Sequence, residues 1–288
     1  MRRCGDSYRV LGFCDNDPRK QGQSLAGHSV FAPAQLRDLP YDQILVASMF
    51  GHEIKAQLVT QFGIPETQIR FAPKSALSPN KTYRPFEDPR TRELARVMLE
   101  YVDDLLKQAG IPYYVDHGTL LGLIRDGDLL PWDDDLDLSV PAAFTAATLQ
   151  AVQEGRATLP HAEELEWTAE TIVDSDQHRI FGVIWSYPED NGLQLRKFAV
   201  SLWFMFPQDG QIRQYINSAP DAFFAGRDEL AYRGRMYPIP KQARDYLKFH
   251  YGEWQVPVQD MSLEEIQNYC PPPRHVRRDY LFGTPDAC

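Results

Sequence analysis

Four aspartates lie within five residues at Asp133–Asp137, where a loop leads into an apolar strand. Alternate residues of a strand share a face, so Asp135 and Asp137 are predicted to present two carboxylates to one side. Asp133 joins them from the approach to the strand. Carboxylates this close repel unless a cation neutralises them or one is protonated. Because hard oxygen ligands suit Mg²⁺ or Mn²⁺, the pattern predicts a divalent metal site.

Two other readings of these acids were weighed. A solvated acidic loop is one, but the alternating Leu136, Leu138 and Val140 favour the start of a buried strand. A calcium-binding EF-hand loop is the other. It needs glycine at its sixth position and glutamate at its twelfth, which are Leu138 and Phe144 when counted from Asp133. The spacing therefore favours a metal site that assists chemistry.

A phosphate-binding turn is expected upstream, at Gly118 and Thr119. A glycine there lets the backbone approach a ligand, and free N–H groups at a helix start favour an anion. Arg125 follows within one more turn or two, and its guanidinium can pair with phosphate. The alternative for Arg125 is a salt bridge to a neighbouring aspartate, Asp126 or Asp128.

The elements that position these residues are read from hydrophobic periodicity. Apolar residues at helical spacing predict a core helix over Thr91–Gly110, followed by a strand at Ile111–Val115 and a short helix from Leu120 to Ile124. Strands are expected at Arg179–Tyr187 and Leu195–Phe206. Together they predict a mixed α+β unit around the acids.

The remaining chain is expected to form a smaller α/β unit. Short strands alternate with one helix, His52–Phe62, in residues 8–71, which indicates a truncated Rossmann-like domain over residues 1–75. Residues 76–90 are rich in proline and are predicted to be a linker. Residues 91–288 would be the catalytic domain. The predicted fold class is thus α/β plus α+β.

The run GTLLGLIRDGDLLPWDDDLDL, residues 118–138, resembles the signature of the LicD/fukutin family of phosphotransferases. The resemblance implies a nucleotidyltransferase-like fold with a mixed sheet. It also implies transfer of a phospho-alcohol unit, such as phosphocholine or ribitol phosphate, from a CDP-linked donor to a glycan or glycolipid. Carried over by position, Asp135 and Asp137 would be metal ligands and Asp133 a third acid. Gly118 and Thr119 would hold donor phosphate.

Several further residues bear on this site. In the family, the strand equivalent to Leu195–Phe206 carries an aspartate that completes the metal site, where this chain has Ser201. Another acid, Asp174, Asp176 or Glu166, was considered as its replacement. Lys197 shares the alternation of Ser201 and can face the same pocket. His117 is either a substrate contact or a structural histidine, and Asp133 is a possible acceptor of the hydroxyl proton.

A second resemblance concerns the N-terminal part. LGFCDNDPRKQGQSLAGHSVFAPAQL, residues 11–36, is similar to the N-terminal domain of bacterial nucleotide-sugar acetyltransferases. The Gly-rich turn with which such domains contact a nucleotide is missing, which favours a structural or docking role here.

Composition limits the classes of function. A net charge of −10 argues against nucleic acid as a partner. Apolar runs stay short of the roughly 20 residues that span a bilayer, and the four cysteines lack metal or disulfide spacing. We expect a cytoplasmic protein, with the basic, proline-rich tail after Tyr269 either loosely ordered or at an anionic partner or the inner membrane face. The rival functions are a nucleotidyltransferase and a non-catalytic scaffold in glycan assembly, and the oligomeric state is left open.

Overall fold

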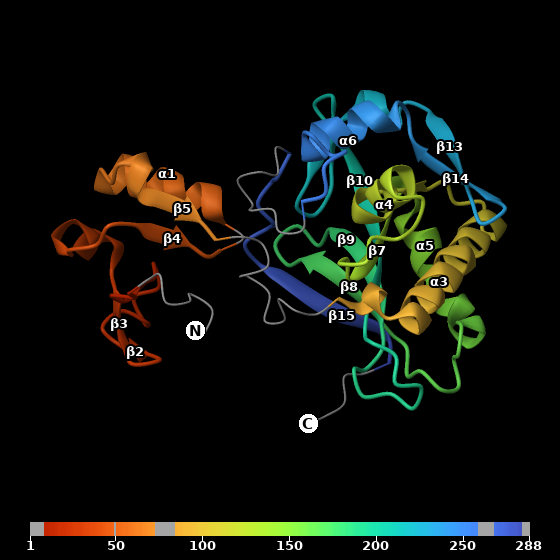
Figure 1. Cartoon of the computed structure of the whole chain (residues 1–288), viewed down its shortest axis with the longest axis horizontal. Helices are drawn as coiled ribbons and strands as arrows, with labels where there is room; N and C mark the ends of the chain where they lie inside the picture. The colour runs from red at the N-terminus through yellow and green to blue at the C-terminus, as the bar shows by residue number, and fades with distance from the viewer. Residues whose placement is uncertain (1–8, 49, 73–83, 259–267, 284–288) are drawn as a thin grey trace. The chain divides into compact units, whose positions relative to one another are not determined.

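A computed structural model describes residues 9–48, 50–72, 84–258 and 268–283, which belong to two compact units (Figure 1). Residues 9–48 and 50–72 form the first unit, and the other described residues form the second. Each unit buries its own hydrophobic cluster. Within the described ranges, no helix has the length and apolar character needed to cross a membrane.

The first unit holds two small sheets rather than one continuous sheet. β3 pairs with β1 in parallel and with β2 in antiparallel, while β4 and β5 pair in parallel and are joined through α1. Helix α1 ends at Gly63, whose φ of 64° is the left-handed conformation that glycine adopts readily. A Rossmann-like fold stays a prediction for this unit. The elements are β1 (Phe13–Cys14), β2 (Ser24–Leu25), β3 (His28–Phe31), β4 (Ile44–Val46), α1 (Gly51–Phe62) and β5 (Ile69–Phe71).

The second unit is built on a mixed sheet of eight strands. Its order is β12-β11-β10-β9-β8-β15, and β7 pairs with β10 on one side and β6 on the other. The β7–β10 pair is parallel and the other pairs are antiparallel. This confirms the expected mixed sheet. The strands are β6 (Tyr114–Val115), β7 (Asp135–Pro141), β8 (Thr168–Asp174), β9 (Ile180–Ser186), β10 (Ala199–Gln208), β11 (Gln211–Arg213), β12 (Ser218–Pro220) and β15 (Val276–Phe282).

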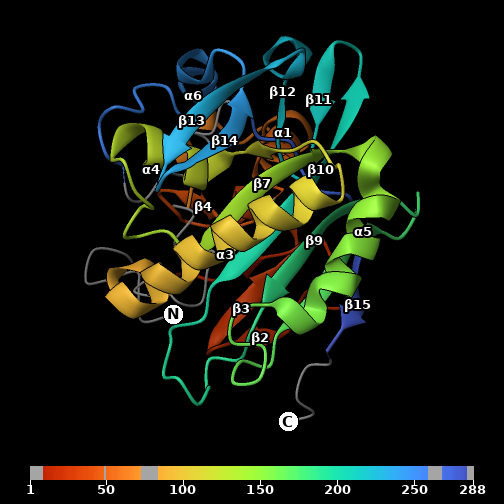
Figure 2. The same ribbon diagram turned by 90° about the vertical axis from the view of Figure 1, so that its right-hand side faces the viewer.

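Helices cover one face and one end of this sheet. In Figure 2, α3 and α5 lie in front of β7, β10 and β9, while α4 and α6 lie near the upper end. A hairpin of β13 and β14 packs beside them. The elements are α3 (Pro89–Gln108), α4 (His117–Arg125), α5 (Thr145–Glu154), α6 (Ala243–Tyr251), β13 (Arg227–Tyr232) and β14 (Arg235–Pro240).

Helix α3 begins earlier than its hydrophobic pattern predicts. The Asp88 carboxylate accepts a hydrogen bond from the Thr91 backbone N–H at 2.8 Å, which caps the helix, and Pro89 suits its first turn. Of the expected linker, residues 76–83 lie outside the described residues. Residues 84–90 are ordered in the second unit as a short 3₁₀ turn, Pro85–Glu87, and the start of α3.

One of the two alternatives for the tail is wrong, because residues 276–282 are not loosely ordered but form β15, which pairs antiparallel with β8. Contact of the tail with an anionic partner or a membrane face stays a prediction. Arg278 there makes an ion pair with Glu170 on β8. Strand β8 itself lies in a segment for which the sequence predicts no strand. Both strands lack a strong apolar alternation of their own, and pairing with a neighbour orders them.

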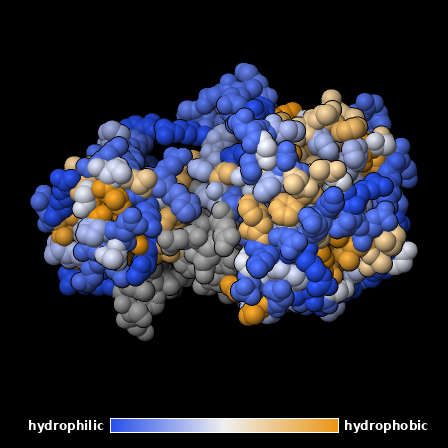
Figure 3. Space-filling view, turned by 90° about the horizontal axis from the view of Figure 1, so that it is seen from above, coloured by the Kyte–Doolittle hydropathy of each residue, from blue (hydrophilic) through white to orange (hydrophobic). Residues whose placement is uncertain are grey.

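Hydrophilic residues predominate on the face shown in Figure 3, with smaller hydrophobic groups among them. The large hydrophobic side chains that are exposed belong to different elements, such as Leu45 on β4, Met236 on β14 and Tyr280 on β15. Exposed apolar residues of this kind are normal on protein surfaces, and they indicate no partner by themselves.

Gly122 is the point at which α4 approaches the following loop most closely. A Cβ at this position would lie 2.7 Å from the Asp128 carbonyl oxygen and 3.0 Å from the Leu130 nitrogen. Both are backbone atoms, so overpacking of about 1–3 kcal/mol should outweigh the roughly 1 kcal/mol that alanine gains in a helix. We expect Gly122→Ala to lower the free energy of unfolding by about 1–2 kcal/mol in urea titrations.

Gly192→Ala is the matched control, because a Cβ at Gly192 would meet no heavy atom within 4 Å. Its free energy of unfolding should stay within about 0.5 kcal/mol of the parent. Equal losses in both variants, or none at Gly122, would contradict the close approach.

Candidate functional site

A fully buried carboxylate, Asp116, stands where β6 passes into α4. Its Oδ1 accepts hydrogen bonds from the His117 backbone N–H and the Tyr246 hydroxyl, both at 2.7 Å. Its Oδ2 accepts from the Ser139 hydroxyl at 2.5 Å, and the Gln214 amide lies 3.5 Å away. One carboxylate therefore joins α4, the strand β7, helix α6 and the chain after β11.

The surroundings of Asp116 favour its ionised form. Burial alone works to raise its pKa, but nearby His117 and His250 and the hydrogen bonds from Ser139 and Tyr246 outweigh it, so the pKa of Asp116 is lowered. Burial also lowers the pKa of His250 to about 3, so that imidazole is neutral at physiological pH. A charged carboxylate thus sits beside a neutral ring.

The predicted acids lie where β7 begins. Leu136, Leu138 and Val140 are fully buried in the core, so the alternate residues of the strand face the other way, as the alternation predicts. One carboxylate oxygen from each of Asp133, Asp134 and Asp135 lies within 4.8 Å of the others. Asp134 was not among the predicted ligands.

Gly118 makes room for this acidic group. A Cβ at Gly118 would lie 2.2 Å from Oδ2 of Asp133, closer than any real contact. The backbone of the first turn of α4 therefore lies directly against a carboxylate of the group. The glycine was expected to let the backbone approach a ligand, and in the structure it lets the backbone approach Asp133.

Asp137 is held differently from the other acids. It is 9% exposed, and its Oδ1 accepts a hydrogen bond from the Trp203 indole at 2.8 Å. Its backbone N–H donates to the Thr119 hydroxyl at 2.9 Å, so Thr119 fastens α4 to β7. Among the described residues, Asp137 does not join the group of three. Its role as a metal ligand and that of Thr119 in phosphate binding stay predictions.

Ser201 lies directly opposite Asp137 in the parallel pairing of β10 with β7, and it is 2% exposed. The serine is thus in register with an acid, as the sequence comparison placed it. The acids considered as replacements are elsewhere. Glu170 occupies the row of Ser201, so Asp174, the last residue of β8, and Asp176, just after it, lie beyond that row. Glu166 is exposed before β8 begins.

The two predicted basic residues differ in their surroundings. Arg125 makes a bidentate pair with Asp126, at 2.8 Å for each bond, and its guanidinium lies over the Trp132 ring. The Arg125 side chain is only 8% exposed. Asp126 already accepts hydrogen bonds from the guanidinium N–H groups that a phosphate would need. Lys197 is exposed just before β10. A phosphate contact by either residue remains a prediction.

Helix α6 supplies residues that the sequence did not indicate. Tyr246 donates a hydrogen bond to Asp116, and the charges of the acids act on Tyr251. Burial and the negative charges of Asp137 and Asp133 raise the pKa of Tyr251 well above its usual value. His250 lies between them against the ring of Tyr246. The only sequence signal was the aromatic spacing of the helix, which is shared by ordinary core helices.

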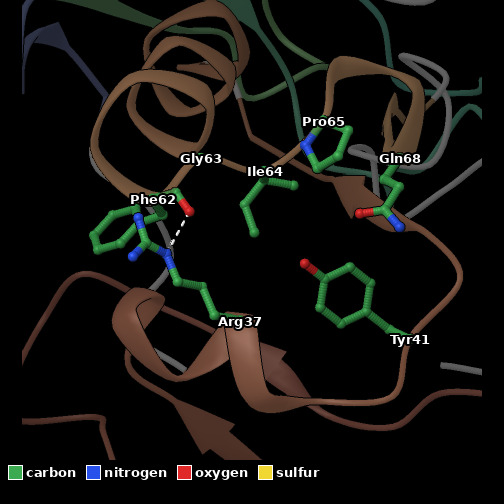
Figure 4. Close-up of a pocket in the computed structure, with 7 residues that line it drawn as sticks. All are labelled: Arg37, Tyr41, Phe62, Gly63, Ile64, Pro65 and Gln68. Carbon is green, nitrogen blue, oxygen red and sulfur yellow. Dashed lines mark hydrogen bonds between the residues drawn. The ribbon is translucent and has the colours of Figure 1, made fainter.

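The first unit contains an open cavity of about 290 Å³, shown in Figure 4. Arg37 at its wall donates hydrogen bonds to the carbonyls of Phe62, at 2.5 Å, and Gln61, at 3.2 Å. The guanidinium thereby satisfies the C-terminal end of α1. The cavity has no carboxylate or nucleophile in its lining, and the acids of the candidate site belong to the second unit.

Comparison with known proteins bears directly on the second unit. Residues 110–242 match the family model described as LicD/FKTN/FKRP, nucleotidyltransferase domain. This match includes Asp116, Ser139, Gln214, the three acids and most of the sheet, whereas Tyr246 on α6 lies beyond it. Residues 110–242 belong to the LicD family. Residues 4–70, in the first unit, match the model described as C2185-like, N-terminal.

Curated relatives of the LicD-family domain include the ribitol 5-phosphate transferase FKRP of Mus musculus and that of Homo sapiens. Each is 29% identical over 171 residues, which cover 56% of this chain and 31% of the relative. The chain thus spans about a third of their length. A solved structure of the lincosamide antibiotic adenylyltransferase LnuA, lincomycin-bound, is 16% identical and covers 52% of this chain and 82% of its own, with a TM-score of 0.32. A score that low supports no argument about the fold.

The hydrogen bond from Tyr246 to Asp116 should be visible in the pH dependence of stability. Hydrogen bonds to charged groups contribute about 1.5–3 kcal/mol, so Tyr246→Phe should lower the free energy of unfolding by about that much at pH 7. The folded pKa of Asp116 is lowered, so its stabilisation is present above the unfolded pKa, about 3.9, and is lost as pH falls through the folded value. The difference between parent and variant should therefore shrink below about pH 4.

Tyr251→Phe, on the same helix, is the control, because its hydroxyl donates no hydrogen bond to any described residue. In urea titrations at pH 7, the free energy of unfolding of Tyr251→Phe should lie within about 0.5 kcal/mol of that of the parent protein. If Tyr246→Phe lowered the free energy of unfolding by the same amount at every pH, the Tyr246 hydroxyl would not stabilise the fold through the Asp116 carboxylate.

Proposed function

We propose that the LicD-family domain transfers a phospho-alcohol group from a CDP-linked donor to a cell-surface glycan or its precursor, with Mg²⁺ or Mn²⁺. The grouping of Asp133, Asp134 and Asp135 against the α4 backbone carries this proposal. The curated relatives are ribitol 5-phosphate transferases, which makes ribitol phosphate the first group to test. Phosphocholine is the second.

The donor set suits a hard divalent cation. Oxygens that share one Mg²⁺ at about 2.1 Å lie roughly 3–4.2 Å apart, so carboxylates within 4.8 Å need only a small side-chain rotation. Asp133, Asp134 and Asp135 would hold the ion, and Asp137 follows them on β7. When bound, the ion would offset the charge of the donor diphosphate and of the departing CMP.

The protein groups around the acids would position the donor. The α4 backbone at Gly118 borders Asp133, so a diphosphate at the acids would lie beside the first turn of that helix. The charges of the same acids act on Tyr251, whose hydroxyl can donate a hydrogen bond to a phosphate oxygen bound beside them. Phosphoryl transfer depends mainly on such positioning and on charge stabilisation, which these elements would provide.

A specific observation favours one rival, a scaffold with weakened catalysis. Ser201 lies opposite Asp137 where the family pattern has an acid, and the acid that shares its row, Glu170, is two strands away on β8 and pairs with Arg278. A hydroxyl is an uncharged and weaker ligand for a hard cation. The rival therefore predicts metal or nucleotide binding without turnover.

The decisive experiment incubates the whole chain with Mn²⁺, CDP-ribitol or CDP-choline, and candidate glycan acceptors. We expect CMP release that depends on the acceptor and falls by about 100-fold or more in Asp135→Asn. Asp176→Asn, an exposed acid at the far end of β8, is the control and should retain the parent rate. Pyrophosphate release from a nucleoside triphosphate would instead indicate nucleotidyl transfer. Binding without turnover of any donor would support the scaffold.

Gly118→Ala tests the metal site without removing an acid. The added Cβ must displace the Asp133 carboxylate, which is the far end of a flexible side chain, so the fold should lose less than about 1 kcal/mol. We expect the affinity for Mn²⁺, measured by calorimetry or electron paramagnetic resonance, to fall by about tenfold or more. Unchanged Mn²⁺ affinity would place the ion away from Asp133.

A further inference from the structure

Gln214 is the link between the buried carboxylate and His117. Its Nε2 lies 2.5 Å from the Ser139 hydroxyl oxygen and 3.5 Å from Oδ2 of Asp116, and its Oε1 lies 3.1 Å from Nε2 of His117. Gln214 is only 4% exposed, so the protein and not solvent decides how its amide is oriented.

Chemistry allows a single orientation of that amide. An ionised carboxylate only accepts hydrogen bonds, and Ser139 already gives its proton to Asp116. The Ser139 oxygen can then only accept, so the group of Gln214 that faces it must be the NH₂. The carbonyl oxygen of Gln214 consequently faces His117 and must accept from Nε2–H. The chain from Asp116 through Ser139 and Gln214 therefore requires a proton on Nε2 of His117, and in the neutral imidazole this leaves Nδ1 without one.

In the neutral imidazole the other ring nitrogen, Nδ1, is the one that can accept a proton. Among the described residues, Nδ1 of His117 has no hydrogen-bond partner, and the side chain is 10% exposed. The next residue is Gly118, whose backbone touches Asp133. The backbone of His117 has a φ of +47°, a conformation that costs a non-glycine residue about 1–2 kcal/mol and that recurs at functional sites.

We infer that His117 is the general base of the phosphotransfer, with Nδ1 as the accepting atom and Gln214 as the positioning residue that holds its tautomer. The inference rests on the proposed function. Nδ1 takes the proton of the acceptor hydroxyl while that oxygen forms the new bond to phosphorus. The bond from phosphorus to the CMP oxygen breaks, and its electron pair leaves with CMP. This assigns the proton to His117 and leaves Asp133 for the cation.

The tautomer can be read without any turnover. The whole chain is labelled with ¹⁵N-histidine, and the His117 signals are identified as those missing in His117→Asn. We expect Nε2 to carry the proton and Nδ1 to show the shift of an unprotonated imidazole nitrogen. In Gln214→Met, which keeps the length of the side chain but not its amide, the two tautomers should exchange. A protonated Nδ1 in the parent protein would overturn the inference.

Kinetics test the base itself, in the CMP-release assay. Asparagine tolerates positive φ, so His117→Asn keeps the backbone while removing the basic nitrogen. We expect kcat to fall by about 10²–10⁴-fold with little change in the KM for the CDP-linked donor. Gln214→Met should lower kcat by a smaller factor, again without a change in donor KM.

His161→Asn is the matched control, because His161 also has a positive φ, 53°, and is half-exposed outside the network. It should retain the parent kcat. The outcomes separate the two proposals. If no donor is turned over, the proposed function fails and no base is needed. If the parent releases CMP and His117→Asn does so equally fast, the proposed function stands and His117 is not the base.

Discussion

The geometry of the candidate site depends on one buried charge. A carboxylate without donors in a protein interior costs several kcal/mol, so Asp116 can be fully buried only if its hydrogen-bond donors are all in place. Those donors come from the start of α4, from Ser139 on β7 and from Tyr246 on α6. The requirement to satisfy one charge thereby fixes the helix that carries Gly118 against the strand that carries the acids.

The same requirement separates two kinds of polar residue in this unit. Asp116 is satisfied by protein donors and does not depend on a ligand. Asp133, Asp134 and Asp135 lie close together at a partly exposed edge, where like charges repel. Asp116 therefore holds the surrounding elements together, whereas Asp133, Asp134 and Asp135 repel one another until a cation binds. A short stretch of chain, from 116 to 135, supplies both.

Sequence reasoning succeeded where the pattern was local. The period of two in Leu136–Val140 correctly assigned the faces of β7, and the hydrophobic spacing of His52–Phe62 located α1 to within one residue. The family resemblance put Ser201 at the position of a third acid, and the parallel register of β10 with β7 sets it opposite Asp137. Each of these inferences needed only neighbouring residues or a known motif.

Sequence reasoning failed where two residues that contact each other are far apart along the chain. Tyr246 lies 130 residues from Asp116 and Gln214 lies 98 residues from it, and neither stands in a motif. An isolated glutamine after a short strand has no spacing that marks it as a link in a network. Asp134 was passed over because strict alternation excludes it, yet it lies in the loop before β7, where alternation does not apply. Strand β15 was missed because its order comes from β8.

The position of β15 at the edge of the sheet has a consequence for synthesis. Strand β8 is complete by residue 174, but its outer edge is paired only by residues 276–282. A nascent chain therefore presents the unpaired N–H and C=O groups of β8 for about a hundred residues of translation, roughly 5–20 s at ordinary elongation rates. An open strand edge is a template for pairing with other chains. Strand β15 covers this edge of β8 only after residue 282 has been made, so the exposure of the edge is set by the order of synthesis.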